Sequence, residues 1–243
     1  MTESSCCSEG SRDCYEQMAL WAAQAERYED MLEYAVKMFQ SAEPWSEEER
    51  ELLLTAVKNF VGCRRYSWRM LYTMEMKQED ETHMDMIKQY RRSIEKELKN
   101  AYESVLCALN SLLACAADSL SAVFFYKLKA DLKRYLAELS FGSERRKAAE
   151  ASLIAYKFAY SIACEKLRPC HPLRLGVALN FAVFHFEILN NVEIACNLTK
   201  SSFDDGLADF DTSPDDSDKE KTAIMLQLLQ DNLTLWTLPV QLK

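Results

Sequence analysis

The stretch SEEERELLLTAVKNFVGCRRYSWRMLYTMEMK, residues 46–77, carries the clearest helical signal in the sequence. It opens with Ser46 and Glu49, an S-x-x-E pair that can cap a helix because each side chain satisfies a free backbone N–H group. No proline follows, and Gly62 is the only helix breaker in the stretch. We therefore predict one long helix over these residues.

The scarcity of glycine and proline extends this prediction to the whole chain. The 243 residues include five glycines and five prolines. Each type makes up about 2% of the chain, against usual contents of roughly 7% and 5%. Hairpins and tight βα loops depend on these residues, so the composition excludes sandwiches, barrels and most α/β architectures. We predict an all-α protein.

Interruptions of the apolar pattern divide the chain into about nine helices. They fall near residues 26, 44, 78, 118, 141, 170, 191 and 215. Because the connections are short, neighbouring helices should be antiparallel. No linker or change in composition divides the chain. We predict a single helical domain over residues 12–237, a flexible N-terminal extension (1–11) and a short C-terminal tail (238–243).

Several side chains at these interruptions are suited to start the next helix. Asp118 or Ser119, Ser143 and Asn191 can each accept a hydrogen bond from a first turn. Pro172 suits a first turn because that position needs no N–H group. The following helix, to about residue 190, is almost wholly apolar from residue 176 to 186. We expect it to be buried on most sides.

The charge balance limits the kinds of partner. Lysines and arginines number 29 against 38 aspartates and glutamates, which gives a net charge of −9 at pH 7. Nucleic-acid binding usually leaves a basic excess, so we exclude nucleic acid as the main partner.

Membrane and secretory signals are absent from the sequence. The N-terminus has no apolar signal segment, and the longest uncharged run, 104–117, has 14 residues. A membrane span needs about 20. We predict no membrane partner and a location in the cytoplasm, with the nucleus as a second compartment.

The nine cysteines and three histidines show no catalytic or metal-binding pattern. No Cys-x-x-Cys pair occurs, and His83, His171 and His185 lie far from any metal-ligand spacing. An odd number of cysteines spread over apolar helical stretches indicates reduced, buried thiols. The chain also lacks a glycine-rich phosphate loop. We predict no metal, no cofactor and no enzymatic activity.

A basic stripe runs along the helix predicted over residues 46–77. Lys58, Arg65 and Arg69 are spaced by seven and four residues, which places them on one side of a helix, whereas Arg64 points elsewhere. A second basic group follows on the helix predicted over 119–139 and contains Lys127, Arg134 and Tyr135. Such stripes are more often solvated faces than binding sites, and spacing alone does not make the two helices converge.

Two amides interrupt otherwise apolar helix faces. In the apolar helix after Pro172, Asn180 lies beside a line formed by Leu179, Val183 and Glu187. On the last helix one face carries Leu228, Asn232, Leu235 and Trp236. A buried amide without hydrogen-bond partners costs roughly 1–3 kcal/mol. These amides therefore either satisfy neighbouring groups of the protein or bind an extended peptide backbone, and the sequence favours neither.

Six segments resemble the 14-3-3 proteins in order and spacing. They are QAERYEDM (24–31), ELLLTAVKNFVGCRRYSWRMLYTMEMK (51–77), KADLKRYLAE (129–138), HPLRLGVALNFAVFHFEILN (171–190), SFDDGLADFDT (202–212) and QDNLTLWT (230–237). The likeness extends over about residues 15–237. Agreement at so many separated segments is highly specific.

The resemblance implies nine antiparallel helices that form a concave groove, and two chains that dimerise through their N-terminal helices. Each groove would hold an extended phosphoserine or phosphothreonine peptide. By position, the phosphate ligands would be Lys58, Arg65, Arg134 and Tyr135, with Arg69 and Lys127 adding positive field. Asn180 and Asn232 would bind the peptide main chain, Leu179, Val183, Leu228 and Leu235 would form an apolar wall, and Glu187 and Trp236 would shape its polar end.

The residue types at the implied site fit a phosphate ligand. A phosphoserine carries about −1.5 to −2 charges at pH 7, and guanidinium groups can engage it in pairs of hydrogen bonds. Asp131, three residues before Arg134, is expected to brace the cations.

The resemblance also implies contacts at the dimer interface. Trp21, Ala25 and Tyr90 fall at interface positions, and Arg27 could pair with Glu97 of the other chain. Ser67 matches an interface serine whose phosphorylation would loosen the dimer.

Several positions depart from the family pattern. They are Tyr66, Leu132, Lys133, Ser93, His185 and Phe186, and the usual acidic tail is reduced to TLPVQLK. Ser93 replaces a lysine that would bridge to Asp30. These changes affect dimer strength and partner choice but leave the phosphate ligands intact.

The sequence therefore predicts a non-catalytic adaptor that binds phosphorylated client proteins and clamps, masks or bridges them. Its partners would be phosphorylated clients and a second copy of the chain, or a related chain in a heterodimer. The alternative is a phosphate-independent helical scaffold that binds clients through the apolar groove. The complete set of phosphate ligands favours the adaptor.

Overall fold

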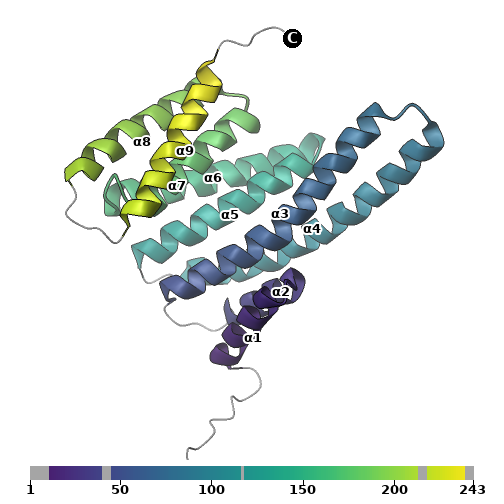
Figure 1. The fold of residues 1–243 in the computed structure, drawn as a ribbon, viewed down its shortest axis with the longest axis horizontal. Coiled ribbons are helices and arrows are strands. Elements are labelled where there is room, and N and C mark those ends of the chain that lie inside the picture. Colours follow the sequence, from purple (N-terminus) through teal and green to yellow (C-terminus); the bar gives the residue numbers. More distant parts are fainter. Residues whose placement is uncertain (1–10, 40–44, 116–117, 213–217, 239–243) are drawn as a thin grey trace, which may run out of the picture. The chain divides into compact units, whose positions relative to one another are not determined.

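The computed structural model describes residues 11–39, 45–115, 118–212 and 218–238. Within these ranges the secondary structure consists of nine helices and no strand (Figure 1). In chain order they are α1 (Arg12–Gln24), α2 (Tyr28–Phe39), α3 (Glu47–Lys77), α4 (Glu81–Cys115), α5 (Ser119–Leu139), α6 (Gly142–Lys166), α7 (Pro172–Glu187), α8 (Val192–Thr212) and α9 (Lys219–Thr237). The predicted all-α class is confirmed. The predicted N-terminal extension, apart from Ser11, and the predicted tail, apart from Leu238, lie outside the described residues.

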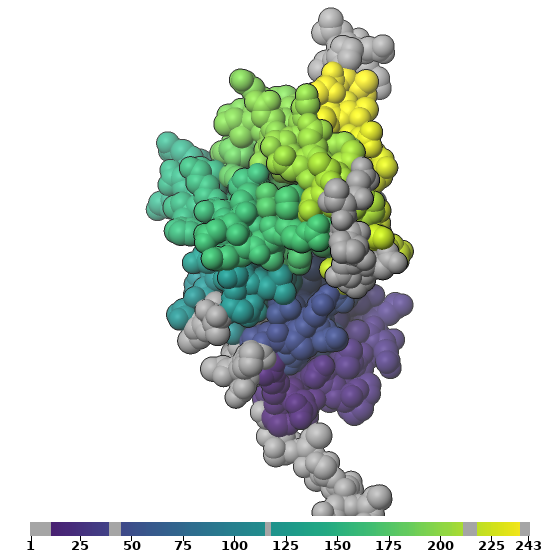
Figure 2. Space-filling view, turned by 90° about the vertical axis from the view of Figure 1, so that its left-hand side faces the viewer, coloured from purple at the N-terminus to yellow at the C-terminus, as the bar shows by residue number. Residues whose placement is uncertain are grey.

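The helices form two compact units. Met1–Cys115 contains α1 to α4, and Ala116–Lys243 contains α5 to α9. Within each unit, consecutive helices make the most extensive contacts, as α3 does with α4 and α5 with α6. In Figure 2 the colours accordingly follow one another in bands within each unit, purple to blue in the first and teal to yellow in the second. That the two units belong to one domain stays a prediction.

The N-terminus of α3 has the predicted capping box. Ser46 Oγ accepts a hydrogen bond from the backbone N–H of Glu49 at 3.2 Å, and Glu49 Oε2 accepts one from the backbone N–H of Ser46 at 2.8 Å. The Glu49 carboxylate also binds Arg12, whose Nε lies 2.6 Å from Oε1. The cap therefore also ties α1 to the start of α3.

Gly62→Ala is expected to raise the free energy of unfolding by about 0.5–1 kcal/mol, because alanine loses less backbone freedom on folding than glycine. Gly62 is exposed in the interior of α3, and a Cβ atom there would meet nothing within 4 Å. Chemical denaturation measures the change. Gly206→Ala is the contrasting variant, because its Cβ would lie 2.9 Å from Cδ2 of Leu175. Gly206→Ala should destabilise the protein, and a Gly62→Ala protein less stable than the wild type would contradict the prediction.

Three predicted helix starts are confirmed. Asp118 Oδ1 accepts a hydrogen bond from the N–H of Ser121 at 2.7 Å, and Asn191 Oδ1 accepts one from Ile194 at 3.3 Å. Pro172 is in the first turn of α7. In these three cases the residue type correctly predicted where the helix starts.

The prediction that Ser143 caps a helix is wrong. α6 begins at Gly142, and the residue before it, Phe141, makes no side-chain cap hydrogen bond. Gly142 has φ +56°, in the left-handed region that favours glycine, so the chain turns from α5 into α6 there and Ser143 already lies within the helix. One other boundary differs from the prediction: α7 ends at Glu187, before residue 190.

A buried ion cluster joins α3 to α4 in the first unit. Arg91, with 7% of its surface exposed, donates from Nε to Glu75 Oε2 at 2.6 Å and from Nη1 to Glu95. Glu95 also accepts a hydrogen bond from Trp68 Nε1 at 2.8 Å. The guanidinium carbon of Arg91 lies 5.8 Å from the ring centre of Trp68 and 5.7 Å from that of Tyr72. One cation thus holds two carboxylates and two rings of facing helices.

Aromatic rings pack between α6 and α7 in the second unit. Tyr156 of α6 is fully buried, and its ring stacks on Phe181 of α7 with centres 5.3 Å apart. The ring centre of Phe184, also of α7, lies 5.5 Å from that of Tyr156. Ala130 and Ala137 of α5 belong to the same cluster, and their small side chains let α5 approach these rings closely.

Candidate functional site

Arg134 is a buried cation on α5 with contacts to three helices. Only 7% of the residue is exposed, and its guanidinium carbon lies 4.6 Å from the ring centre of Tyr135. Its Nε donates a hydrogen bond to the Tyr156 hydroxyl at 3.2 Å. Its terminal nitrogens make longer ion pairs, with Nη2 3.6 Å from Asp131 Oδ1 and Nη1 3.6 Å from Glu187 Oε2.

The carboxylate of Asp131 accepts hydrogen bonds from side chains of α5, α6 and α7. Lys127 Nζ lies 2.9 Å from Oδ2, and the amide nitrogen of Asn180 lies 3.0 Å from each carboxylate oxygen. The Tyr156 hydroxyl donates to Oδ1. The expected brace beneath the cations is therefore present. We call Lys127, Asp131, Arg134, Tyr156 and Asn180 the α5–α7 ion cluster.

The charges of this cluster support one another. Burial opposes the charged form of Asp131 most strongly, but Lys127, Arg134 and the Tyr156 hydroxyl outweigh it, so the pKa of Asp131 lies below its usual value. Burial likewise opposes the charge of Arg134, yet the surrounding Tyr156 and Asp131 raise its pKa. Burial and the Asp131 charge raise the pKa of Tyr156. The cluster thus holds charged Asp131 and Arg134 beside a neutral hydroxyl.

The position of Asn180 bears on the two uses open to its amide. A carboxylate only accepts hydrogen bonds, so contact with both oxygens of Asp131 identifies the atom facing it as the amide nitrogen. The described residues donate no hydrogen bond to the amide oxygen. One end of the amide is therefore satisfied by the protein, and its acceptor end is available.

The predicted apolar wall lies on α7 and α9, which contact each other (Figure 1). Leu179 and Val183 of α7 are half-buried, whereas Leu228 and Leu235 of α9 are 41% and 65% exposed. Asn232 of α9 is half-buried.

Trp236 is held against this wall by a ring of α7. It stacks on Phe186 with ring centres 4.7 Å apart and an interplanar angle of 12°. Phe186 is one of the positions that depart from the family pattern, and its ring has a packing role here.

The predicted phosphate ligands Lys58 and Arg65 lie on α3, in the first unit, as does Arg69, which is predicted to add positive field. Lys58 and Arg69 are exposed and Arg65 is half-buried. Arg64 points elsewhere, as predicted: its Nε is 2.8 Å from Glu97 Oε2, and its guanidinium carbon is 3.7 Å from the ring centre of Phe60. The meeting of Lys58 and Arg65 with Arg134 and Tyr135 involves both units and stays a prediction.

The predicted dimer residues include large exposed rings. Trp21 is 56% exposed and Tyr90 is 62% exposed, and Ala25 is exposed as well. Arg27 pairs with Asp30 of its own chain, and Glu97 pairs with Arg64 as described above. The pair between Arg27 and Glu97 of two chains stays a prediction, and it would have to displace or share these intrachain contacts.

Two serines at predicted interface positions bind their own helices. Ser67 Oγ donates to the carbonyl of Cys63 at 3.1 Å, and Ser93 Oγ donates to the carbonyl of Tyr90 at 2.8 Å. Ser93 therefore makes a local contact where a lysine would reach outward. The proposed effect of phosphorylation at Ser67 stays a prediction.

His185 is a buried histidine whose Nδ1 has no hydrogen-bond partner among the described residues. Its ring centre lies 4.7 Å from that of Phe181 and 5.8 Å from that of Phe184. Burial, with a smaller contribution from the charge of Lys157, lowers the pKa of His185. The ring is therefore a neutral core residue near pH 7.

His185→Phe is expected to reduce the loss of stability in acid. The unfolded chain binds the histidine proton near pH 6.5, whereas the folded chain binds it only at lower pH. Stability therefore falls as the pH drops below about 6.5 in the wild type. Free energies of unfolding measured between pH 5 and pH 7.5 should decline less steeply in the variant, and equal slopes in the two proteins would contradict the prediction.

Tyr156 is the site residue that the sequence did not single out. It lies in α6, 25 positions after Asp131, at a position spaced like any core residue of that helix. The only available signal was a hydroxyl among alanines and aromatic residues, since a buried tyrosine hydroxyl usually finds a partner.

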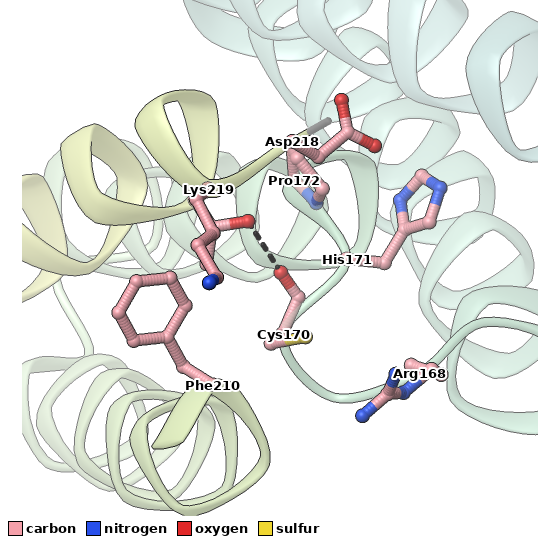
Figure 3. A pocket seen from close by; sticks show the side chains of 8 residues that line it. Arg168, Cys170, His171, Pro172, Phe210, Asp218 and Lys219 are labelled. Carbon is pink, nitrogen blue, oxygen red and sulfur yellow. Dashed lines mark hydrogen bonds between the residues drawn. The ribbon is translucent and has the colours of Figure 1, made fainter. Parts of the chain in front are cut away.

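A small cavity of about 90 Å³ lies elsewhere in the second unit, between the turn before α7 and the start of α9 (Figure 3). Its walls include Cys170, Phe210 and Lys219, and it contains none of the predicted site residues. Thr222 Oγ1 donates to the Cys170 carbonyl at 2.9 Å. Burial and the neighbouring Asp209 raise the pKa of Cys170, so its thiol stays protonated and unreactive.

Of the other described cysteines, Cys14, Cys164 and Cys196 are half-buried. Cys63 of α3 and Cys107 of α4 are exposed, so the prediction of buried thiols is wrong for these two. Cys6, Cys7 and the side chain of Cys115 lie outside the described residues. In the described parts of the chain, no group of three His, Cys, Asp or Glu side chains is arranged to hold a metal ion. None of the described helices has both the length and the apolar character of a membrane span.

The fold and the site define an all-helical protein with a cation cluster beside an amide-bearing apolar helix face. The family model described as 14-3-3 protein matches residues 18–237. The chain is 50% identical over 224 residues to 14-3-3 protein epsilon of Drosophila melanogaster, which covers 90% of this chain and 85% of that relative. It is 49% identical over 230 residues to 14-3-3-like protein C of Nicotiana tabacum, covering 92% of this chain and 88% of the relative.

The chain belongs to the 14-3-3 family. Proteins of this family are non-enzymatic adaptors that bind phosphoserine and phosphothreonine. Membership implies that the chain binds client proteins and dimerises.

Proposed function

We propose that this protein binds phosphoserine and phosphothreonine segments of client proteins through Lys58, Arg65, Arg134 and Tyr135. Arg134 is the observation that carries the proposal. Its guanidinium is buried and held from behind by Asp131 and Tyr156, while its terminal nitrogens make only ion pairs of 3.6 Å. A cation held in this way is ready to bind an anion without first being ordered.

Electrostatics favour the phosphorylated client over the unmodified one. A phosphoserine brings about −1.5 to −2 charges and three acceptor oxygens. Two guanidinium groups can each donate a pair of hydrogen bonds to it, and an ammonium and a phenol can complete the shell. An unmodified serine satisfies none of these cations, so phosphate selectivity follows from the proposed ligands.

The client main chain would lie along α7 and α9. Asn180 supports this role because its amide oxygen is available while its nitrogen is fixed by Asp131. Asn232 would act in the same way from α9. The proposed apolar wall is Leu179, Val183, Leu228 and Leu235, and Glu187 and Trp236 would form its polar end, with Arg69 and Lys127 adding positive field.

A dimer would present two such sites to one client. We propose that Trp21, Ala25 and Tyr90 contribute to its interface, together with the pair of Arg27 and Glu97. Two linked sites raise the affinity for doubly phosphorylated clients through effective concentration. The same residues could form a heterodimer with a related chain. We also propose that the protein acts in the cytoplasm, and secondarily in the nucleus.

A peptide titration tests the function. A fluorescent peptide with arginine three residues before phosphoserine and proline two after it is compared with its dephosphorylated twin. The wild type should prefer the phosphorylated peptide by at least about 100-fold, the equivalent of two charge-assisted hydrogen bonds. Arg65→Ala should lose this preference, and Arg64→Ala, a variant with the same change of charge on the same helix, should keep it. Equal binding of the two peptides by the wild type would favour a phosphate-independent scaffold instead.

A further inference from the structure

The buried hydroxyl of Tyr156 links the anion and the buried cation of the α5–α7 ion cluster. It donates to Asp131 Oδ1 and accepts a hydrogen bond from Arg134 Nε at 3.2 Å. The residue is fully buried between α5 and α7. No other described side chain contacts the Nε atom of Arg134 through a hydrogen bond.

The direction of both hydrogen bonds is fixed by chemistry. The Asp131 carboxylate can only accept, so the single hydroxyl proton of Tyr156 points toward it. The guanidinium of Arg134 can only donate, so its Nε–H points at the oxygen lone pairs of Tyr156. The hydroxyl cannot rotate without breaking one of these bonds.

This arrangement determines which edge of Arg134 faces outward. The guanidinium is planar, so fixing Nε–H toward Tyr156 also fixes the plane and the direction of Nη1 and Nη2. Neither terminal nitrogen is within hydrogen-bond distance of Asp131 or Glu187, since both ion pairs measure 3.6 Å. Their N–H groups are therefore the ones available to a ligand.

We propose that Tyr156 is a positioning residue for phosphate recognition, because its hydroxyl fixes the inner edge of Arg134 and thereby presents the two terminal nitrogens to the phosphate. The proposal rests on the proposed function of Arg134 as a phosphate ligand. It makes Tyr156 part of the binding machinery although it never touches the client.

A purely structural role for Tyr156 makes different predictions. Its ring stacks on Phe181 and contacts Phe184, and these contacts survive in Tyr156→Phe. The hydroxyl effect can therefore be separated from core packing. Tyr160→Phe is the matched control, since Tyr160 lies one turn further along α6 and its hydroxyl interacts with Ser202 and Cys164.

A double-mutant cycle with Arg134→Lys tests the proposal. Lysine keeps the charge of Arg134 but has no Nε–H group in a rigid fork. Tyr156→Phe should weaken binding of the phosphoserine peptide about tenfold in the wild-type background, the effect of one hydrogen bond to a charged group. In the Arg134→Lys background it should weaken binding less than about twofold. Equal effects in both backgrounds would overturn the proposal, as would an equal loss in Tyr160→Phe.

A second measurement observes the hydrogen bond in the wild type itself. In the ¹⁵N NMR spectrum of the wild type, the Nε–H signal of Arg134, assigned by its absence in Arg134→Lys, should be protected from exchange with water. A rapidly exchanging signal would contradict the hydrogen bond to Tyr156. If the wild type prefers the phosphopeptide but Tyr156→Phe binds it equally well, the positioning role fails and the proposed function stands. If the wild type shows no preference for the phosphopeptide, the proposed function itself fails.

Discussion

Arg134→Met is expected to weaken binding of a phosphoserine peptide by at least about 100-fold, because it removes two charge-assisted hydrogen bonds of about 1.5–3 kcal/mol each. Binding of the dephosphorylated peptide should hardly change. The affinity of Arg134→Lys for the phosphoserine peptide should lie between those of Arg134→Met and the wild type, because lysine retains the charge but lacks the planar set of donors. Fluorescence polarisation titrations of the two peptides measure these differences.

Controls for this prediction must separate the loss of the direct contact with the phosphate from the effects of the changed net charge and of any loss of folding. Arg146→Met has the same change in net charge, and Arg146 is exposed on α6. It should bind both peptides like the wild type. Because Arg134 is buried beside Asp131, the thermal midpoint of Arg134→Met is measured in parallel. A folded Arg134→Met protein with wild-type affinity for the phosphopeptide would show that the phosphate binds elsewhere.

Arg91→Met is expected to lower the free energy of unfolding by about 3–5 kcal/mol, because it leaves two partly buried carboxylates without their cation. The side chains of Glu75 and Glu95 are only 15% and 19% exposed. Both lie at the contact of α3 with α4, so the loss should be seen as a lower midpoint in urea denaturation. Arg91 is remote in sequence from every proposed ligand of the client.

Arg64→Met is the matched control for Arg91→Met. Arg64 also bridges two glutamates, but Glu29 and Glu97 have side chains 76% and 52% exposed. Exposed pairs of this kind contribute about 0–1 kcal/mol. Replacing both Glu75 and Glu95 with glutamine in the Arg91→Met protein should restore much of its stability. Equal losses in Arg64→Met and Arg91→Met would show that burial does not govern these ion pairs.

The sequence predicted the elements whose signals are local. Ser46, Asp118 and Asn191 start their helices by hydrogen bonds to residues three positions away, and this spacing is visible in the chain. Ser143 has the same residue type but lies inside α6, because Gly142 adopts a left-handed conformation and makes the turn instead. Backbone conformation of this kind depends on how α5 and α6 pack, which the residue pattern does not state.

The candidate site was predictable only in part. Periodicity placed Arg134 and Asn180 on helices, and the resemblance supplied their roles. The contacts that prepare them depend on Tyr156, which approaches Asp131 only through the packing of α6 on α5 and α7. Long-range contacts between core positions leave no periodic pattern in the sequence, so the part played by Tyr156 could not be predicted from it.

Asp131 receives donors from three helices, and this makes its neighbours epistatic. A substitution at Lys127, Tyr156 or Asn180 changes what the same carboxylate can offer to the others. Effects of paired substitutions should therefore depart from the sum of the single ones, as they do within any shared network. If each residue is substituted singly, every variant loses part of the same shared network, and the summed losses in stability or binding exceed the contribution of the whole cluster. Evolutionary change within the cluster would then have to proceed through coordinated replacements.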